Sequence, residues 1–180
     1  MRNRLLPLKG IFSIAATASI LLFSTNVNAA ERAVFKYRIL RQSVSVPELA
    51  RFAETGEVSA TVGAYIRMAG QAPEQVREPL TREIKVNPLL LYRLLNSRAG
   101  DIVLDKMSEV IHTPDKVASR QALRSAIMTS ALSNNQVTLI EVLQNYPTQD
   151  VHIDGDRLVE VYNQLSALAG RLPINLNLSF

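Results

Sequence analysis

Residues 32–40, Arg-Ala-Val-Phe-Lys-Tyr-Arg-Ile-Leu, and residues 150–154, Asp-Val-His-Ile-Asp, are the stretches that decide the fold of this chain. In both, apolar side chains recur at every second position, as in a strand that is buried on one face. Residues 43–46 can add a short returning strand. Because the two main stretches lie far apart in the sequence, their pairing would tie both ends of the domain into one sheet.

Between these strands the sequence predicts short helices with recognisable first and last residues. The segments Ser45-Val46-Pro47-Glu48 and Thr138-Leu139-Ile140-Glu141 both have capping-box spacing, in which a hydroxyl accepts a first-turn amide and the glutamate reaches back to the cap. Gly56 and Gly70 can end two helices in the left-handed conformation. Further helices are expected to begin at Ser59, Pro73, Asn87-Pro88, Ser97, Ala118 and Asp154.

Two helices carry more specific expectations. Pro79 lies inside the helix that begins at Pro73, and proline lacks an amide donor and clashes with the preceding turn, so a kink or break is predicted there. The helix that follows Asn87-Pro88 holds leucines over much of its circumference. This pattern predicts that it forms the centre of the core.

Together these elements predict an α+β, mainly α fold. We expect a helical bundle of about seven or eight short helices, with a small antiparallel sheet of about two or three strands formed by the N-terminal strands and the 150–154 strand. A single domain is expected over residues 30–172. Residues 173–180 alternate apolar and polar side chains and are predicted to form a flexible or edge-pairing tail.

Residues 1–29 predict an export signal. Basic residues precede an apolar run over residues 11–23, and Val27-Asn28-Ala29 places small side chains where a signal peptidase reads them. Cleavage is therefore expected after Ala29, and the protein is expected in the periplasm or outside the cell. The alternative is an uncleaved anchor, but a spanning helix needs roughly 20 predominantly apolar residues and this run is shorter.

Charge and composition exclude some classes of function. The full sequence has a net charge of +4, from 20 basic and 16 acidic residues. Residues 1–29 hold three of the basic residues and none of the acidic ones, which leaves 17 basic against 16 acidic, a net charge of +1. A nucleic-acid partner, which needs a clustered basic excess, is therefore not expected. The chain has no cysteine, which excludes disulfides and thiol nucleophiles.

No residue pattern predicts a catalytic, cofactor-binding or metal site. No serine lies in the Gly-x-Ser-x-Gly elbow that exposes the nucleophile of an α/β hydrolase. His112 and His152 are the only imidazoles, whereas zinc needs three or four protein ligands. His152 and Asp154 share one face of a strand, but a structural role is favoured, with Asp154 capping a helix. His112 is expected at a helix end, where its charge favours the negative end of the dipole.

Several segments together carry a family resemblance. They are Ala30–Tyr37, Ser43–Leu49, Phe52–Gly56, Val86-Asn87-Pro88 with its leucine helix, Glu109–Pro114, and Tyr146-Pro147 leading to Val151–Asp154. The chain resembles a cyanobacterial domain of unknown function that occurs alone after a signal peptide or precedes an α/β-hydrolase domain of the dienelactone-hydrolase or lipase type. This resemblance transfers no triad residue, and Pro79 departs from the family's uninterrupted helix.

The combined prediction is an exported, non-catalytic accessory or interaction domain of the type associated with α/β hydrolases. Its partner would be a protein, such as an α/β hydrolase on another chain, and no cofactor is expected. Two alternatives stay open. One is an esterase- or lipase-like hydrolase, as the family label suggests, with His152, Asp154 and nearby serines as candidates. The other is a carrier of an apolar ligand between the leucine-rich helices.

Overall fold

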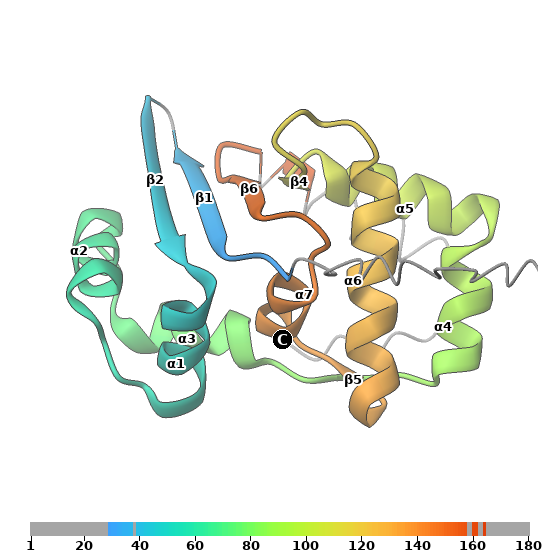
Figure 1. The fold of residues 1–180 in the computed structure, drawn as a ribbon, viewed down its shortest axis with the longest axis horizontal. Helices are drawn as coiled ribbons and strands as arrows, with labels where there is room; N and C mark the ends of the chain where they lie inside the picture. Colours follow the sequence, from blue (N-terminus) through green and yellow to red (C-terminus); the bar gives the residue numbers. More distant parts are fainter. Residues whose placement is uncertain (1–28, 38, 158–159, 162–163, 165–180) are drawn as a thin grey trace, which may run out of the picture.

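The computed structural model describes residues 29–37, 39–157, 160, 161 and 164, and in this part of the chain it contains seven helices and two sheets (Figure 1). The helices are α1 (Val46–Thr55), α2 (Ala60–Ala69), α3 (Pro73–Thr81), α4 (Pro88–Leu95), α5 (Arg98–Ser108), α6 (Ser119–Asn134) and α7 (Leu139–Gln144). The strands are β1 (Arg32–Tyr37), β2 (Leu40–Ser45), β3 (Ile84–Lys85), β4 (Ile111–His112), β5 (Gln136–Val137) and β6 (Asp150–Asp154). The predicted α+β, mainly α class is confirmed.

The main sheet has the strand order β2-β1-β6-β4, and β3 pairs with β5 in a separate ribbon. The predicted pairing of the 150–154 strand with the N-terminal strand is confirmed, but β6 runs parallel to β1, from Arg32 opposite Asp150 to Lys36 opposite Asp154. Both of these pairs are ion pairs, with closest N···O distances of 2.7 and 3.0 Å, and such cross-strand charges favour this register. The β1–β2 and β4–β6 pairs are antiparallel as predicted, but the parallel β1–β6 pair makes the sheet mixed, and it has four strands where two or three were predicted.

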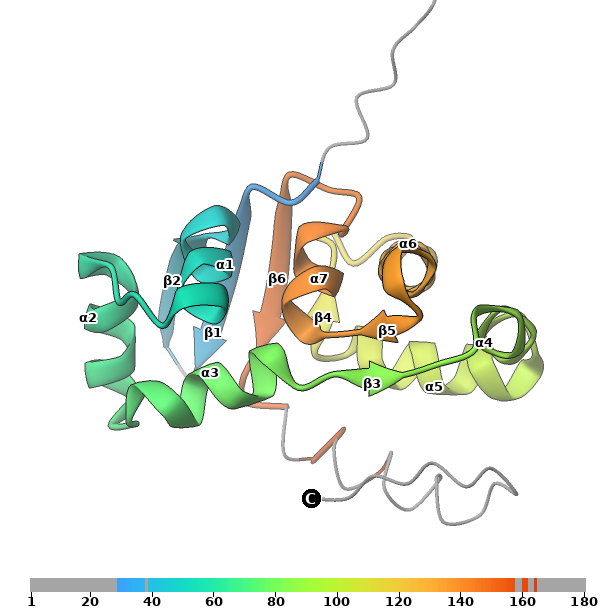
Figure 2. The same ribbon diagram turned by 90° about the horizontal axis from the view of Figure 1, so that it is seen from below.

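The core lies between the sheet and the helices that cover it. In Figure 2, α1 lies in front of β1 and β2, and α7 lies beside β6. The largest fully buried side chains come from these elements, from α5 and α6, and from the loop after α7; they include Phe52, Leu104, Leu123, Leu143, Tyr146 and Val151. Sheet and helices therefore share one apolar core, as expected for a two-layer domain.

Most predicted helix ends are confirmed. Gly56 and Gly70 follow α1 and α2 with φ of 76° and 63°, the left-handed conformation that glycine adopts most easily. The Thr138 hydroxyl accepts from the Glu141 amide at 3.2 Å, and the Glu141 carboxylate accepts from the Thr138 amide at 3.0 Å. The capping box at Ser45 is wrong, because Ser45 is still the last residue of β2 and its side chain makes no capping hydrogen bond.

Pro79 does not break α3. The helix continues to Thr81, and the Arg82 amide still donates to the Glu78 carbonyl at 3.0 Å. Proline removes a single amide donor, and only two helical residues follow it, so little of the helix depends on that hydrogen bond. The predicted break is therefore wrong.

The leucine-rich helix α4 is not the centre of the core. Only Leu95 is buried, whereas Leu89, Leu90 and Tyr92 are 58, 61 and 55% exposed. The helix lies at the edge of the domain, where it packs on α5 and α6 (Figure 1). We call the surface formed by Leu89, Leu90 and Tyr92 the α4 face.

Three predictions concern segments outside the described residues. They are the signal over residues 1–29, of which Ala29 alone is described, the greater part of the last helix, and the tail over 173–180. No helix in the described part of the chain is both long enough and apolar enough to cross a membrane.

Candidate functional site

Two loops that are distant in the sequence meet at the end of the main sheet. One follows β4 and leads into α6, and the other precedes β6. Antiparallel pairing of β4 with β6 places His112 opposite His152, with ring centroids 5.5 Å apart. The prediction that His112 ends a helix is wrong, since it lies in β4. The pair brings the only two imidazoles of the chain together.

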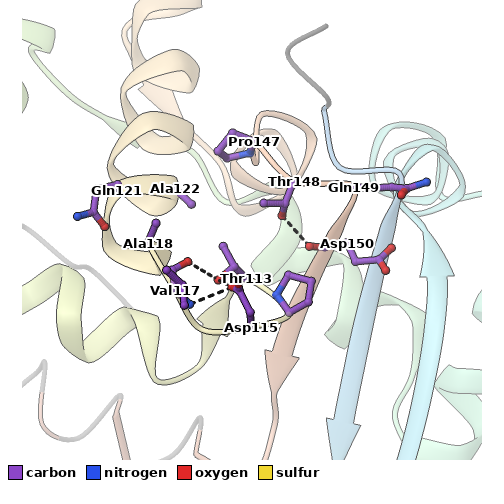
Figure 3. Close-up of a pocket in the computed structure, with 11 residues that line it drawn as sticks. Thr113, Asp115, Val117, Ala118, Gln121, Ala122, Pro147, Thr148, Gln149 and Asp150 are labelled. Carbon is purple, nitrogen blue, oxygen red and sulfur yellow. Dashed lines mark hydrogen bonds between the residues drawn. The ribbon is translucent and has the colours of Figure 1, made fainter. Parts of the chain in front are cut away.

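Residues 113–118 form a tightly bonded loop after His112 (Figure 3). The Thr113 hydroxyl shares its single hydrogen between the Val117 carbonyl at 2.7 Å and the Asp115 carboxylate at 2.9 Å, and it lies 3.0 Å from the Ser119 hydroxyl. The Asp115 carboxylate also accepts from the Val117 amide at 2.9 Å, and these contacts lower the pKa of Asp115. Lys116 and Ala118 have φ of 61° and 57°, so the loop holds two non-glycine residues in the left-handed region.

An open cleft of about 570 Å³ lies between this loop and residues 147–150 (Figure 3). Its lining is mainly apolar, and its two carboxylates belong to Asp115 and Asp150. Asp150 is already paired with Arg32, whose Nε and Nη2 donate to the two carboxylate oxygens at 2.7 and 3.0 Å. Asp115 is therefore engaged within its own loop and Asp150 with β1, which fits a binding cleft better than a pair of acid–base catalysts.

A smaller cavity of about 140 Å³ lies next to this cleft and shares Pro114 with it. It is lined by Val34, Lys36, Arg41, His112, Pro114, Lys116, His152, Ile153 and Asp154. We call it the basic pocket. Its polar side chains come from β1, β2, β4, β6 and the loop after β4, so only the folded sheet assembles it.

The two histidines of the basic pocket have defined surroundings. His112 is buried, and its Nδ1 lies 2.7 Å from the Thr113 carbonyl; a carbonyl oxygen can only accept, so Nδ1 carries the hydrogen and Nε2 faces other partners. Burial lowers the pKa of His152, and electrostatic interactions with His112, Arg41 and Lys116 lower it further, while Asp150 opposes them. His152 is therefore neutral at neutral pH.

His152 and Asp154 do not form a catalytic pair. The Asp154 carboxylate accepts instead from Lys36 Nζ at 3.0 Å and from the Asp156 amide at 3.1 Å. The second bond closes a local turn over residues 154–156, and the predicted capping of the last helix by Asp154 falls at residues that the structure does not fully describe. Burial alone would raise the pKa of Asp154, but the hydrogen bond and charge of Lys36 outweigh it and leave the pKa lowered. The described residues also contain no group of three or more histidine, aspartate or glutamate side chains arranged for a metal ion.

The Lys36–Asp154 pair predicts an acid-dependent loss of stability. An aspartate whose folded pKa lies below its unfolded value stabilises the protein above the unfolded pKa, and this contribution disappears as the pH falls through the folded pKa. Lys36→Gln should cost about 1 kcal/mol at neutral pH, since Lys36 is partly exposed and screened. The cost should shrink below about pH 3.8, the ordinary Asp pKa. Urea unfolding of the wild-type protein and the Lys36→Gln variant, from neutral pH to below pH 3.8, measures the difference in unfolding free energy. A difference that stays as large at low pH would contradict the stabilising role of the Lys36–Asp154 pair.

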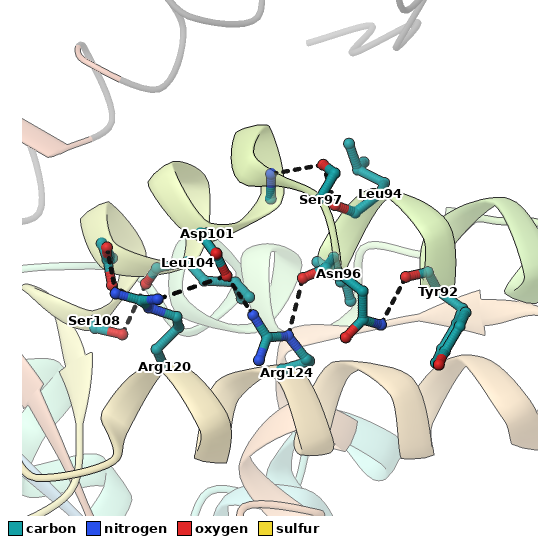
Figure 4. Close-up of polar contacts among 12 residues, drawn as sticks. Tyr92, Leu94, Asn96, Ser97, Asp101, Leu104, Ser108, Arg120 and Arg124 are labelled. Carbon is teal, nitrogen blue, oxygen red and sulfur yellow. Dashed lines mark hydrogen bonds and ion pairs between the residues drawn. The ribbon is translucent and has the colours of Figure 1, made fainter.

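A second polar cluster fixes α4 and α5 onto α6 (Figure 4). Arg120 of α6 binds the Asp105 carboxylate through Nε and Nη2 at 2.5 and 2.8 Å. Arg124 donates to the Leu95 carbonyl at 2.9 Å and to Asp101 at 2.6 Å. The Leu95 contact satisfies a carbonyl at the C-terminal end of α4, so this helix is held in place although its outer face is apolar and exposed.

The sequence identified some of these features and missed others. It predicted that His152 and Asp154 share a strand, and two of the segments that carry the family resemblance, Glu109–Pro114 and Tyr146-Pro147, reach into the two loops. It missed the pairing of the histidines, because β4 is only two residues long and such a strand leaves no periodic signal. It also missed the basic pocket, whose members come from four separate segments, residues 34–36, 41, 112–116 and 152–154.

These features define a class: an α+β domain with a small mixed sheet, a loop cleft and an exposed apolar helix. The chain belongs to the family described as alpha/beta hydrolase of unknown function (DUF1400), whose sequence profile matches residues 29–154. No curated protein and no solved structure is significantly similar to this chain. Membership agrees with the resemblance to a domain of unknown function.

Proposed function

We propose that this protein is an exported, non-catalytic accessory domain that binds an α/β hydrolase through the α4 face. The observation that carries the proposal is the exposure of three large apolar side chains on one eight-residue helix, Leu89, Leu90 and Tyr92. Exposed apolar clusters on a soluble domain commonly mark protein-binding surfaces. Residues 1–29 support the export part of the proposal.

The fold supports a non-catalytic role. In the described residues the main sheet has one parallel strand pair, whereas an α/β hydrolase builds its nucleophile elbow on a multi-stranded parallel sheet. The sequence also lacks the Gly-x-Ser-x-Gly elbow. The family description names an α/β hydrolase. Because this sequence lacks the elbow of such an enzyme, we interpret the domain as a companion of an α/β hydrolase.

The geometry of α4 suits a docking surface. Asn87 caps the helix by accepting from the Leu89 and Leu90 amides at 3.0 and 3.1 Å, and Arg124 holds its other end. A helix fixed at both ends presents its side chains with little loss of conformational entropy on binding. Arg93 is exposed on the same helix, four residues after Leu89 and three after Leu90, so the α4 face also carries a positive charge. This favours a partner surface that combines apolar residues with an acidic group.

Site-specific crosslinking tests the proposal. A photoreactive phenylalanine analogue replaces Tyr92 in the full-length protein in its native cell, and mass spectrometry identifies the crosslinked protein. The expected product is a protein that contains a Gly-x-Ser-x-Gly elbow. Binding of that purified hydrolase is then measured for Leu89→Asp/Leu90→Asp, which should weaken it at least tenfold because two hot-spot contacts are lost.

Leu132→Asp is the matched control, because Leu132 is 68% exposed on α6 and should tolerate the change with binding intact. Crosslinks that never include an α/β hydrolase, or equal binding by the α4 variant and the control, would overturn the proposal. An ester-hydrolysis assay of the protein alone addresses catalysis. Turnover that His152→Ala abolishes would show that the domain is itself the enzyme.

The carrier alternative gains no support from the two cavities described above. The cleft lies between two loops, the basic pocket lies against the strands of the main sheet, and neither is lined by a leucine of α4. The leucines that suggested an apolar ligand site are instead exposed or turned toward α5 and α6.

A further inference from the structure

The basic pocket contains more positive charge than its carboxylate can neutralise. Its lining includes the cations Lys36, Arg41 and Lys116 against the single carboxylate of Asp154. The net charge of the whole protein gives no hint of this, since basic and acidic residues are nearly balanced outside residues 1–29. Folding brings four separate segments together and so creates the local excess of positive charge.

The three cations of the basic pocket differ in whether a carboxylate of the protein already binds them. Lys36 is engaged by Asp154 at 3.0 Å and lies 3.7 Å from Asp156. Within the described residues, Arg41 and Lys116 lie within ion-pair distance of no carboxylate. Both are exposed at the mouth of the pocket, so their charged groups can meet a ligand from solvent.

The histidines form the inner wall. With Nδ1 of His112 committed to the Thr113 carbonyl, its Nε2 and the ring of His152 are left to face the pocket or each other. The pKa of His152 is lowered partly by the same Arg41 and Lys116, which reports a positive potential at that ring. An anion bound there would relieve this repulsion.

We infer that the basic pocket binds a small oxyanion, the phosphate group of free phosphate or of a phosphomonoester, through Arg41, Lys116 and the imidazole of His152. Phosphate matches donors that converge from several directions, because each of its oxygens can accept hydrogen bonds. The volume of about 140 Å³ is smaller than the roughly 300–1,000 Å³ of sites that enclose drug-sized ligands. The pocket therefore takes the charged group, and any ester substituent extends toward the neighbouring cleft. This inference is independent of the proposed α4 interaction.

Binding and protonation are coupled at this site. The charged and titratable groups that act on His152 are His112 from β4, Arg41 from β2, Lys116 from the loop, and Asp150 from β6. Lys36 of β1 and Asp154 of β6 also line the pocket. A bound anion favours protonated His152, so the pKa of His152 should rise on binding, and by linkage protonation should strengthen binding.

The experiment is a histidine-detected NMR titration of the protein expressed from its full-length gene. Inorganic phosphate and glycerol 3-phosphate are added in separate arms, with sodium chloride at matched ionic strength as the reference. We expect the ring signals of His112 and His152 to shift saturably when one of the two phosphate compounds is added, and the pKa of His152 to rise when that compound is bound. The arm with the tighter binding distinguishes free phosphate from a phosphomonoester.

Arg41→Gln and Lys116→Asn should each weaken binding about tenfold, the loss expected for one charge-assisted hydrogen bond. Asparagine is chosen at Lys116 because it tolerates the left-handed conformation. Without ligand, both variants should raise the pKa of His152 toward its ordinary value, since a repelling charge is removed. Arg51→Gln, at an exposed position of α1 outside the pocket, is the matched control and should change neither quantity.

Two results would overturn the inference. One is the absence of saturable histidine shifts at millimolar concentrations of either phosphate compound. The other is a shift that sodium chloride reproduces, or that Arg41→Gln and Lys116→Asn leave as large as in the control, because general screening would then explain it.

Discussion

Replacing Gly100 by alanine should destabilise the protein by about 3 kcal/mol or more, the upper range for overpacking a close contact. Gly100 lies in the first turn of α5, against the backbone at the end of α4. A methyl group there would lie 2.1 Å from the Leu94 carbonyl oxygen and 2.8 Å from Leu95 Cα. Both are backbone atoms of α4, so relief requires the two helices to separate. Urea unfolding monitored by circular dichroism measures the loss.

Gly70→Ala is the matched control for this substitution. Gly70 also has a constrained conformation, with φ of 63°, but an added methyl group would meet no atom within 4 Å. Its cost should stay at about 1–2 kcal/mol, the penalty for a left-handed alanine. Gly100→Ala should also weaken hydrolase binding, since the α4 face would shift without any change in its own side chains. Similar stability losses for the two variants would contradict the close approach of α4 and α5.

Phe52→Ala should cost about 3–5 kcal/mol, the range for removing a buried aromatic side chain. Phe52 is fully buried on α1 and belongs to the cluster that includes Leu143 and Val151, so truncation leaves a cavity between helix and sheet. The neighbouring backbone limits collapse, because the Phe52 carbonyl also accepts the Gly56 amide that ends α1. Thermal and chemical unfolding should both report the loss.

Leu132→Ala provides the reference for an exposed apolar residue. The Leu132 side chain is 68% exposed on α6, so its truncation removes little buried area and should change stability by less than about 0.5 kcal/mol. The contrast between these two substitutions measures burial rather than hydrophobicity. Equal effects would show that α1 is not packed on the sheet as described.

The sequence predicted the local structure well where a few neighbouring residues decide it. Thr138 and Glu141 form the predicted capping box, and Gly56 and Gly70 end their helices in the predicted conformation. In each case the hydrogen-bonding groups lie within four residues of one another, so spacing alone contains the information. Ser45 is the instructive exception, because a strand partner claimed the residue that the local pattern assigned to a cap.

Exposure was harder to predict. The leucines of α4 suggested a central helix, yet the neighbours available to α4 cover only the side that carries Leu95. A leucine-rich sequence cannot reveal whether its partner belongs to the same chain or to another protein. The exposure of the α4 face therefore supports the proposed interaction. The hydrophobic periodicity of the sequence could not provide this support, because it does not show which apolar side chains are exposed.

The sequence by itself determined the α+β class, the helix boundaries set by caps, glycines and prolines, and the absence of a nucleophile elbow. Only the tertiary structure decided the parallel direction of β6, the meeting of His112 with His152, and the gathering of Arg41 and Lys116 around them. The physical reason is the distance along the sequence between the interacting groups. Hydrogen bonds at helix ends act between near neighbours, whereas strand direction and local charge depend on segments that become neighbours only after the core has formed.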